Sequence, residues 1–313
     1  MILTVTLNPS VDISYRLDKF KIDEVNRTAV AIKTAGGKGL NVTRVAHTLG
    51  SDVTATGILG GTIGTFITNQ LADQGIKYDF YKINQESRNC IAILHEGKQT
   101  EILEAGPHLS ELEANQFYYH FIQLINKYDV DVITISGSLP KGFSADVYKN
   151  LIRYANKENI PVVLDTSGPT LAAILKDSSL KLAAIKPNRE ELSAIEGETL
   201  ATNIEDWQAI LTTFNYDNCE WVIMSMGKDG AFVKHHSDYY KVSIPTIEVI
   251  NPVGSGDATV AGIAKAISEK MTAEDLLKTA MTAGMLNTME AGTGTVNPDL
   301  YDEYYKQVQV RKL

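Results

Sequence analysis

VDVITISG (130–137) is a run of apolar, mostly β-branched residues that ends in a glycine. Similar runs follow it at PVVLD (161–165), LAAI (182–185) and EWVIMSMG (220–227), and helix-like segments separate them. These runs do not alternate strictly between apolar and polar residues, which is typical of strands buried on both faces of a parallel sheet. The sequence therefore predicts an α/β fold, in which helices flank a doubly wound, mostly parallel sheet.

The alternation of strand-like and helix-like segments continues on both sides of this region. A strand-like run, 2–7, opens the chain, and a second is expected at 52–59. Ser110 and Glu113 have the spacing of a capping box at a helix start. Helices are expected near 40–49, 65–73, 110–128, 144–157, 170–176, 204–214, 256–270, 272–290 and 298–307. Ligands of such a sheet are expected at the carboxyl ends of its strands.

Two segments, 11–35 and 87–106, break this rhythm because they carry strand patterns without helix signals. They predict antiparallel strands, with a hairpin turn at Glu96-Gly97-Lys98. We therefore expect a small antiparallel β-sheet lid from these segments, and an α/β nucleotide- and substrate-binding domain from 1–10, 36–86 and 107–313. A small sheet leaves one face uncovered, so the lid could cover an active site, a second subunit or both.

The composition is that of an ordinary globular protein with an acidic balance. The 313 residues include 29 basic and 38 acidic side chains, which gives a net charge of −9. Such a surface disfavours non-specific binding to nucleic acid or to an anionic membrane. No apolar run approaches the roughly 18 residues of a membrane span. We expect a cytoplasmic protein with small-molecule ligands and no nucleic-acid or membrane partner.

The strongest local motif is NPVGSGD (251–257), which precedes the helical pattern ATVAGIAKAISEK. Gly254 and Gly256 would let the backbone approach a ligand closely, and the N–H groups of a helix N-terminus suit phosphate. Asp257 falls in the first turn of that helix. Taken alone, Asp257 could equally be a favourable charge on the helix dipole.

A second glycine turn, GGKGLN (36–41), also enters a predicted helix and places Lys38 within reach of an anion. It is not a Walker A motif, because Gly39 stands where Ser or Thr would follow the lysine. The alternative interpretation is a tight turn with a solvated lysine.

A third motif, KPNREE (186–191), directly follows the predicted strand LAAI. Asn188 and Glu191 could face the same way and hold a hydrated Mg²⁺, which prefers oxygen ligands. They could also form a helix N-cap, and both roles are compatible.

Weaker candidates lie at other predicted strand ends. The exit at Ser225, Gly227 and Gly230 is glycine-rich, although a plain β-turn would look the same. Arg88 offers a planar cation suited to phosphate. Five histidines lack the spacing of a metal motif, so we expect surface or packing roles for His95, His108, His120, His235 and His236.

Together the motifs resemble the PfkB carbohydrate kinase family, relatives of ribokinase, over essentially the whole chain. The resemblance is carried by NPSVD (8–12), GGKGLN (36–41), SGSLP (136–140), KPNREE (186–191) and NPVGSGDATVAG (251–262). Ala258 departs from the pattern, since relatives commonly carry Ser or Thr after the aspartate.

The resemblance implies roles for named residues. Asp257 would be the base that takes a proton from the sugar hydroxyl, and the backbone of Gly254, Ser255 and Gly256 would form an anion hole. ATP would contact Lys186, Asn188, Ser225, Gly227, Gly230 and Asn287. Mg²⁺ would lie near Asn188 and Glu191. Sugar hydroxyls would contact Asp12, Gly37 and Asn41, and the sugar's phosphate would contact Lys38, Arg88, Asn89 and Ser138.

Within the family the chain is most similar to the branch that acts on hexose phosphates. This similarity implies ATP-dependent phosphorylation of D-tagatose 6-phosphate at its 1-hydroxyl, in lactose and galactose breakdown, with fructose 1-phosphate as the alternative substrate. Some relatives are activated by a monovalent cation, and 281–294 would supply that site here. In this family the lid commonly forms a homodimer interface, which we also expect.

Overall fold

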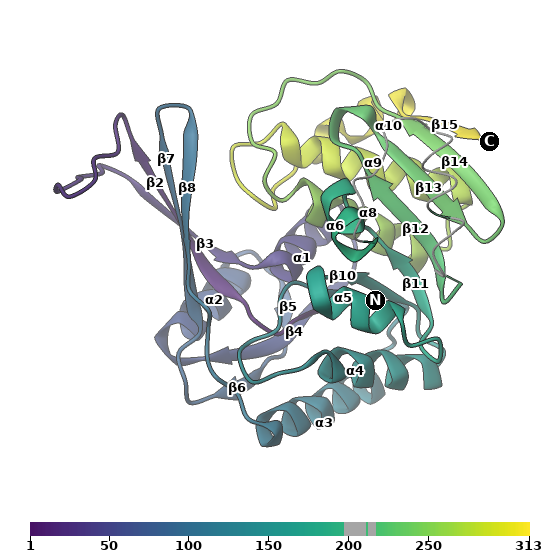
Figure 1. Ribbon diagram of the computed structural model, residues 1–313, viewed down its shortest axis with the longest axis horizontal. Helices are drawn as coiled ribbons and strands as arrows, with labels where there is room; N and C mark the ends of the chain where they lie inside the picture. Colours follow the sequence, from purple (N-terminus) through teal and green to yellow (C-terminus); the bar gives the residue numbers. More distant parts are fainter. Residues whose placement is uncertain (197–210, 212–216) are drawn as a thin grey trace.

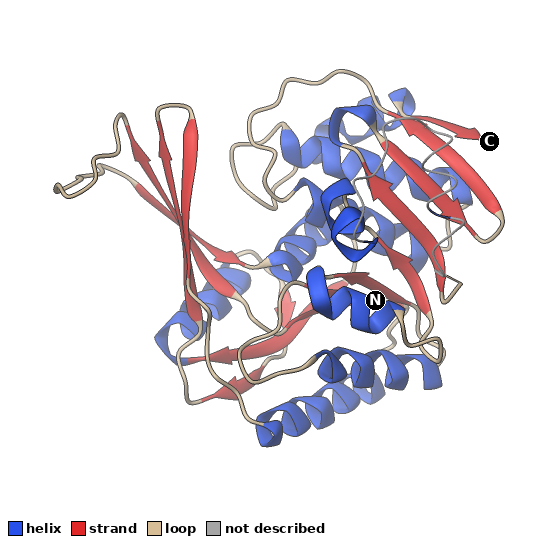
Figure 2. Cartoon of the chain, in the orientation of Figure 1, coloured by secondary structure: helices blue, strands red, loops and turns tan. Residues whose placement is uncertain are grey.

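The computed structural model describes residues 1–196, 211 and 217–313 (Figure 1). It contains a large mixed sheet with helices on both faces and a second, smaller sheet that stands away from it (Figures 1 and 2). In spatial order the large sheet consists of β15 (Gln309–Lys312), β14 (Asp238–Ser243), β13 (Ala231–His235), β12 (Cys219–Ser225), β11 (Leu182–Ile185), β10 (Val162–Asp165), β9 (Val132–Ser136), β1 (Ile2–Thr6), β4 (Val53–Gly60) and β5 (Lys77–Tyr78), with β6 (Tyr81–Ile83) paired to β4.

The strands from β12 to β5 are parallel, whereas β13, β14 and β15 continue the sheet antiparallel. The described helices are α1 (Lys38–Thr48), α2 (Gly61–Asp73), α3 (Glu111–Lys127), α4 (Ala145–Lys157), α5 (Gly168–Leu175), α6 (Arg189–Glu196), α8 (Ser255–Ser268), α9 (Ala273–Thr288) and α10 (Tyr301–Gln307). None of these helices is long and apolar enough to cross a membrane. The expected α/β architecture is confirmed.

Each central strand contributes side chains to two hydrophobic cores, because successive side chains point to opposite faces of the sheet. In β1, Leu3 and Val5 join the core beneath α3, α4 and α5, whereas Ile2 joins the core beneath α1, α8 and α9. This burial on both faces explains why the strands lack polar alternation in the sequence. It also leaves the carboxyl ends of the parallel strands as the place where polar groups can gather.

The small sheet has the order β3 (Ala31–Gly36), β2 (Ser10–Leu17), β7 (Arg88–His95) and β8 (Lys98–Leu103). Its outer pairs are antiparallel, but β2 and β7 pair in parallel. The expectation of a wholly antiparallel lid is therefore wrong for this pair. β2 follows β1 and β7 follows β6, so both strands leave the large sheet in the same direction (Figure 2).

The small sheet is anchored only at its base. Val11, Ile13 and Ala35 pack with Leu40 of α1 and Ile67 of α2 in a third core. Further along, the β8 residues are all exposed. The small sheet is therefore packed at one end and exposed to solvent at the other.

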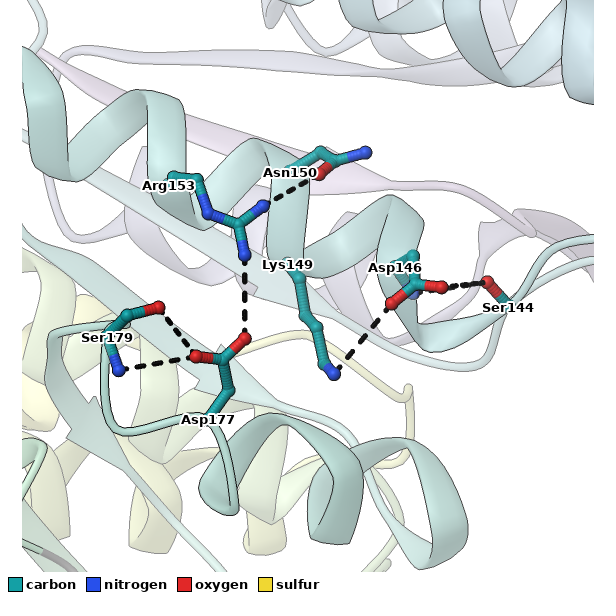
Figure 3. Close-up of polar contacts among 7 residues, drawn as sticks. All are labelled: Ser144, Asp146, Lys149, Asn150, Arg153, Asp177 and Ser179. Atoms are coloured by element: carbon teal, nitrogen blue, oxygen red, sulfur yellow. Dashed lines mark hydrogen bonds and ion pairs between the residues drawn. The ribbon is translucent and has the colours of Figure 1, made fainter.

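Polar contacts fasten α4 to the turn that precedes β11 (Figure 3). Ser144 caps the helix by accepting the Asp146 N–H, and Arg153 reaches the Asp177 carboxylate at 3.5 Å. Asp177 also accepts both the hydroxyl and the N–H of Ser179. These contacts tie the helix layer to the approach of β11.

Several expectations need adjustment along the chain. The short strands β5 and β6 and the terminal strand β15 are absent from the sequence-based expectation. They are short and, unlike the equally short β10 and β11, they are not apolar runs. The helix expected near 204–214 lies outside the described residues, apart from Leu211. The capping box at Ser110 and Glu113 is confirmed.

Candidate active site

Asp257 lies in the first turn of α8 and is only 6% exposed. The Asn41 side-chain amide of α1 donates to Asp257 Oδ2 at 2.7 Å. Burial raises the pKa of Asp257 to about 7, and the charge of Asp165 adds to the effect, while Lys38, Asn41 and Lys186 oppose it. A carboxyl group poised near neutral pH can accept a proton from a reacting hydroxyl.

The residue at the N-cap of α8, Gly254, adopts the left-handed conformation with φ 85° and offers no side-chain cap. A Cβ atom there would also lie 2.7 Å from Thr293 Cγ2. At Gly256, a Cβ would lie 3.0 Å from Lys186 Nζ, so this glycine makes room for a buried ammonium at the helix N-terminus. Backbone N–H groups and a lysine together favour an anion at this point.

Two carboxylates surround Lys38 at the N-terminus of α1. The Lys38 ammonium lies 3.4 Å from Asp165 Oδ2 and 4.0 Å from Glu191 Oε1. Burial works against the charged ammonium, but Asp165, Asp257 and Glu191 outweigh it and raise the pKa of Lys38. Gly137 brings the loop after β9 against the Lys38 side chain, since a Cβ at Gly137 would lie 3.8 Å from Lys38 Cβ.

Asp165, the last residue of β10, was not singled out from the sequence. It is 3% exposed, and its Oδ2 atom is paired with the Lys38 ammonium at 3.4 Å. The signal for it was the acidic residue that closes PVVLD, at the carboxyl end of a predicted parallel strand. Asp165 and Glu191 both face the Lys38 ammonium, and their carboxylate oxygens have the donor chemistry of a Mg²⁺ site.

Asn188 and Glu191 cap α6 reciprocally. Asn188 Oδ1 accepts the Glu191 N–H at 2.7 Å, and Glu191 Oε2 accepts the Asn188 N–H at 2.9 Å. The N-cap interpretation is therefore confirmed. The remaining oxygen, Glu191 Oε1, faces Lys38. The cap thus orients Glu191 toward the carboxylate cluster.

Arg44 is a second residue that sequence reasoning missed. It is 6% exposed and donates to the carbonyls of Ala35 and Thr293 and to Asn41 Oδ1. Burial lowers its pKa to about 10. Arg44 thus holds the Asn41 side chain, whose amide donates to Asp257, and it stands one helical turn after Asn41 in α1.

On the lid side, Asp12 of β2 accepts a hydrogen bond from Ser10 Oγ at 2.7 Å. Burial raises the pKa of Asp12, against the hydrogen bond from Ser10 and the charge of Arg44. Gly36 is required on the paired strand, since a Cβ there would lie 2.0 Å from Asp12 Cγ. Gly37 donates its backbone N–H toward Asp12, which links the lid to the start of α1.

Arg88 and Asn89 open β7 at the base of the lid. The Arg88 guanidinium donates to the carbonyls of Asn8 and Glu104 at 3.1 and 2.9 Å. The backbone and side chain of Asn89 both contact the Glu104 carboxylate. These contacts fix the two side chains where the lid meets the large sheet.

The other expected residues have local structural roles. Gly230 has φ 79°, and a Cβ there would lie 2.1 Å from the Val242 carbonyl oxygen. Ser225 pairs with Asn188 across the strand ends, and Gly227 starts the turn that follows β12. Asn287 is fully buried and bridges the Val253 carbonyl to the Gly294 N–H.

Ser138 lies in a hollow of about 390 Å³ beside the carboxyl ends of β9 and β10. Its lining includes Thr166 and Ser167, which directly follow Asp165. The hollow is thus part of the strand-end region that also holds Lys38 and Asp165.

The profile of the pfkB family carbohydrate kinases matches residues 5–300. The chain belongs to the PfkB family. A tagatose-6-phosphate kinase of Staphylococcus epidermidis is 50% identical over 310 residues, with 99% of both chains covered. The resemblance inferred from the sequence motifs is therefore confirmed for the PfkB family.

Solved PfkB-like structures agree with this assignment. Phosphofructokinase-2 from Escherichia coli, in complex with substrates and products, superposes with a TM-score of 0.88 at 27% identity, covering 97% of this chain and 98% of that chain. The same protein in complex with fructose-6-phosphate gives a TM-score of 0.87 at 26% identity over the same shares. The chain is a kinase of the carbohydrate class.

Proposed function

We propose that this protein transfers the γ-phosphoryl group of ATP to the 1-hydroxyl of D-tagatose 6-phosphate, giving ADP and D-tagatose 1,6-bisphosphate, in lactose and galactose breakdown. The full-length similarity to a tagatose-6-phosphate kinase supports this substrate. The observation that carries the chemistry is the buried Asp257 carboxyl at the start of α8, held by Asn41.

In the proposed reaction the sugar 1-oxygen forms a bond to the γ-phosphorus, and the bond from that phosphorus to the β,γ-bridging oxygen breaks. The hydroxyl proton passes to Asp257, and the electron pair of the broken bond leaves with ADP. Phosphoryl transfer depends mainly on positioning and charge neutralisation. A pKa of about 7 suits Asp257 to this proton transfer without requiring a strong base.

The backbone of Gly254, Ser255 and Gly256 would form the anion hole for the transferring group. The helix N-terminus supplies N–H donors and a partial positive charge there. Lys186, whose ammonium lies against Gly256, would contact an ATP phosphate. Lys38, whose side chain is 40% exposed beside Asp165, would contact the existing phosphate of the sugar.

Asp165, Glu191 and Asn188 fit a Mg²⁺ site on donor chemistry. Asp165 offers a buried carboxylate and Glu191 offers Oε1, and both oxygens face the Lys38 ammonium. Asn188 would act mainly by fixing Glu191 through the cap. When bound, Mg²⁺ would neutralise charge on the ATP phosphates.

The nucleotide would lie along Ser225, Gly227 and Gly230, at the exit of β12. Asn287 would lie near the nucleotide. It would connect the loop before α8, through Val253, to the loop after α9, through Gly294. Residues 281–294 would also supply a site for a monovalent cation, and the E. coli neighbour has been crystallised with potassium.

The sugar would lie between the lid base and α1. Asp12, Gly37 and Asn41 would hold its hydroxyls. Its 6-phosphate would be held by Lys38, Arg88, Asn89 and Ser138. Arginine can bind phosphate through two parallel donors, which explains how a chain of net charge −9 takes an anionic substrate. Closure of the lid would exclude water, a competing acceptor.

We also propose that segments 11–35 and 87–106 act as the lid of an α/β domain made from 1–10, 36–86 and 107–313, and that two copies associate through it. Ile32 and Leu103, which the register puts on one face of this sheet, are 48% and 61% exposed, and Ile102 on the opposite face is 55% exposed. Apolar side chains exposed on one small sheet are typical of an interface.

A coupled ADP-release assay at saturating Mg-ATP tests the substrate. Tagatose 6-phosphate, fructose 6-phosphate and fructose 1-phosphate are compared by kcat/KM, and the first is expected to give the highest value. A highest value for fructose 1-phosphate would make the protein a 1-phosphofructokinase with the same chemistry. Absence of ADP release above the ATPase background with all three would overturn the hexose-phosphate assignment.

A further inference from the structure

A cluster of metal-ligating side chains lies outside the candidate active site, at the far end of β12. Glu220 is the second residue of β12, His235 ends β13 and His236 follows in the turn to β14. Their ligand atoms lie within 4.8 Å of one another, the one such group found among the described residues. The antiparallel pairing of β12 with β13 brings these residues together.

The distances have the form of a chelating site. Glu220 Oε1 lies 3.5 Å from His235 Nε2 and 3.9 Å from His236 Nε2. Two ligands on a tetrahedral zinc ion, each at 2.0–2.1 Å, stand about 3.4 Å apart. Both imidazoles therefore place a nitrogen close to one carboxylate oxygen, at separations near those of ligands on one zinc ion.

The fold holds the two rings in place. His235 stacks on the buried Trp221 ring, with centroids 3.7 Å apart and planes 7° apart. Along a regular strand the next side chain would point to the opposite face. His236 instead has φ 52°, and its ring lies beside that of His235 at 4.4 Å between centroids. Its backbone N–H also donates to the Glu220 carbonyl.

Neighbouring charges leave the cluster available. Asp238, which pairs with His235 across the hairpin, is held by Lys312 at 2.6 Å. Glu220 and His236 expose 48% and 67% of their side chains, so an ion can enter and water can occupy a fourth position. Two imidazoles with one carboxylate favour zinc over the oxygen-preferring Mg²⁺ or Ca²⁺.

We propose that Glu220, His235 and His236 form a Zn²⁺ site with three protein ligands and one open position. Glu220 is separated from Ser225 by about 17 Å along β12, at roughly 3.3 Å per residue. The ion would therefore link β12 to the β13–β14 turn and take no part in phosphoryl transfer. The inference does not depend on the proposed function.

The test is a calorimetric titration of the full-length protein with ZnCl₂ in a non-chelating buffer containing excess MgCl₂. The variants are E220Q and H236N, both at exposed side chains, and H108N is the matched control at an exposed histidine outside the cluster. Circular dichroism checks that each variant is folded. Absorption of bound Co²⁺ in the visible range reports whether histidine ligation is present.

We expect one equivalent of Zn²⁺ to bind to the wild-type protein and to H108N. Affinity should fall about 100-fold or more in E220Q and in H236N, since loss of a direct ligand costs at least as much as loss of its supporting contacts. The Co²⁺ bands should disappear in the same two variants. Unchanged binding in E220Q and H236N, which would place the ion elsewhere, or absence of a saturable site in the wild-type protein, would overturn the proposal.

Discussion

The two sheets of this protein use strands in opposite ways. Every residue of β1 is buried, whereas every residue of β8 is exposed. β1 has neighbours on both edges and a helix layer on both faces, while β8 forms one edge of a sheet that is packed only at its base. Packing on both faces holds the side chains around β1 in place. The exposed side chains of β8 leave a surface that another molecule can cover.

This difference matches the distribution of the candidate site. Asp165, Lys186 and Asp257 belong to the large unit, where packing on all sides can shift a pKa and hold a side chain still. Asp12 and Arg88 come from the base of the lid, where it joins that unit. In the proposed assignment, the reaction chemistry would lie on the closely packed unit, and the small sheet would supply only substrate contacts.

The largest expected effect is on turnover. Replacing Asp257 by Asn removes the proton acceptor but keeps the size of the side chain, so kcat should fall about 1,000-fold with little change in the KM for the sugar. Steady-state kinetics measure both quantities. Turnover within a few-fold of the wild-type value would contradict the role of Asp257 as the base.

The contrast between the sheets can be measured directly as stability. Ile135 of β9 is 0% exposed and Ile102 of β8 is 55% exposed. Ile135→Ala should lower the free energy of unfolding by about 3 kcal/mol, because it opens a cavity in a packed core. Ile102→Ala should change it by less than about 0.5 kcal/mol at concentrations where the protein is monomeric. Denaturant titration measures the free energy of unfolding of both variants. Equal decreases in the two variants would contradict the difference in packing between the two sheets.

A smaller effect concerns pH. Asp257 must be ionised to accept a proton, so kcat/KM should fall as the pH drops below about 7. Asp165 helps to raise that pKa, so Asp165→Asn should move this acid limb to lower pH, besides lowering kcat through the proposed metal site.

The matched control is Glu269→Gln at the far end of α8, where an exposed carboxylate is removed. This variant should keep the wild-type pH profile. An acid limb that stays in place in Asp165→Asn would show that Asp165 does not act on Asp257.

A substitution on the exposed surface of the small sheet should have the smallest effect on the stability of the fold. Ile102→Asp should leave the thermal unfolding of the monomer nearly unchanged but abolish association, because a charge cannot be buried unpaired at an interface. Sedimentation velocity measures the mass. Glu101→Ala, its neighbour in β8, is the control and should keep the wild-type mass; a monomeric wild-type protein at all concentrations would refute the lid interface.

Much of the fold could be predicted because its signals are local. Apolar runs ending in glycine indicated the buried strands, and the Ser110 and Asn188 caps marked helix starts that the structure confirms. The parallel pairing of β2 with β7 could not be predicted, since β2 and β7 are far apart in the chain and strand direction follows from where each leaves the large sheet. The short strands β5, β6 and β15 gave too little pattern.

The candidate site divides in the same way. Glycine turns such as 36–39 and 254–256 are visible in sequence because positive φ and close backbone approach restrict the residue type. Asp165 and Arg44 were missed, because a single acidic or basic residue has no local pattern that reveals its partners. Their importance comes from contacts with residues brought near by folding.

The sequence by itself determined the α/β class, the PfkB family and the motifs that would bind phosphate, because these depend on residue types at fixed short spacings. Only the tertiary structure decided which charges meet. Burial raises the pKa of Asp257, Arg44 holds Asn41, and the pairing of β12 with β13 brings Glu220 to two histidines. Such effects depend on distance and desolvation in three dimensions, and neither can be read from positions along a chain.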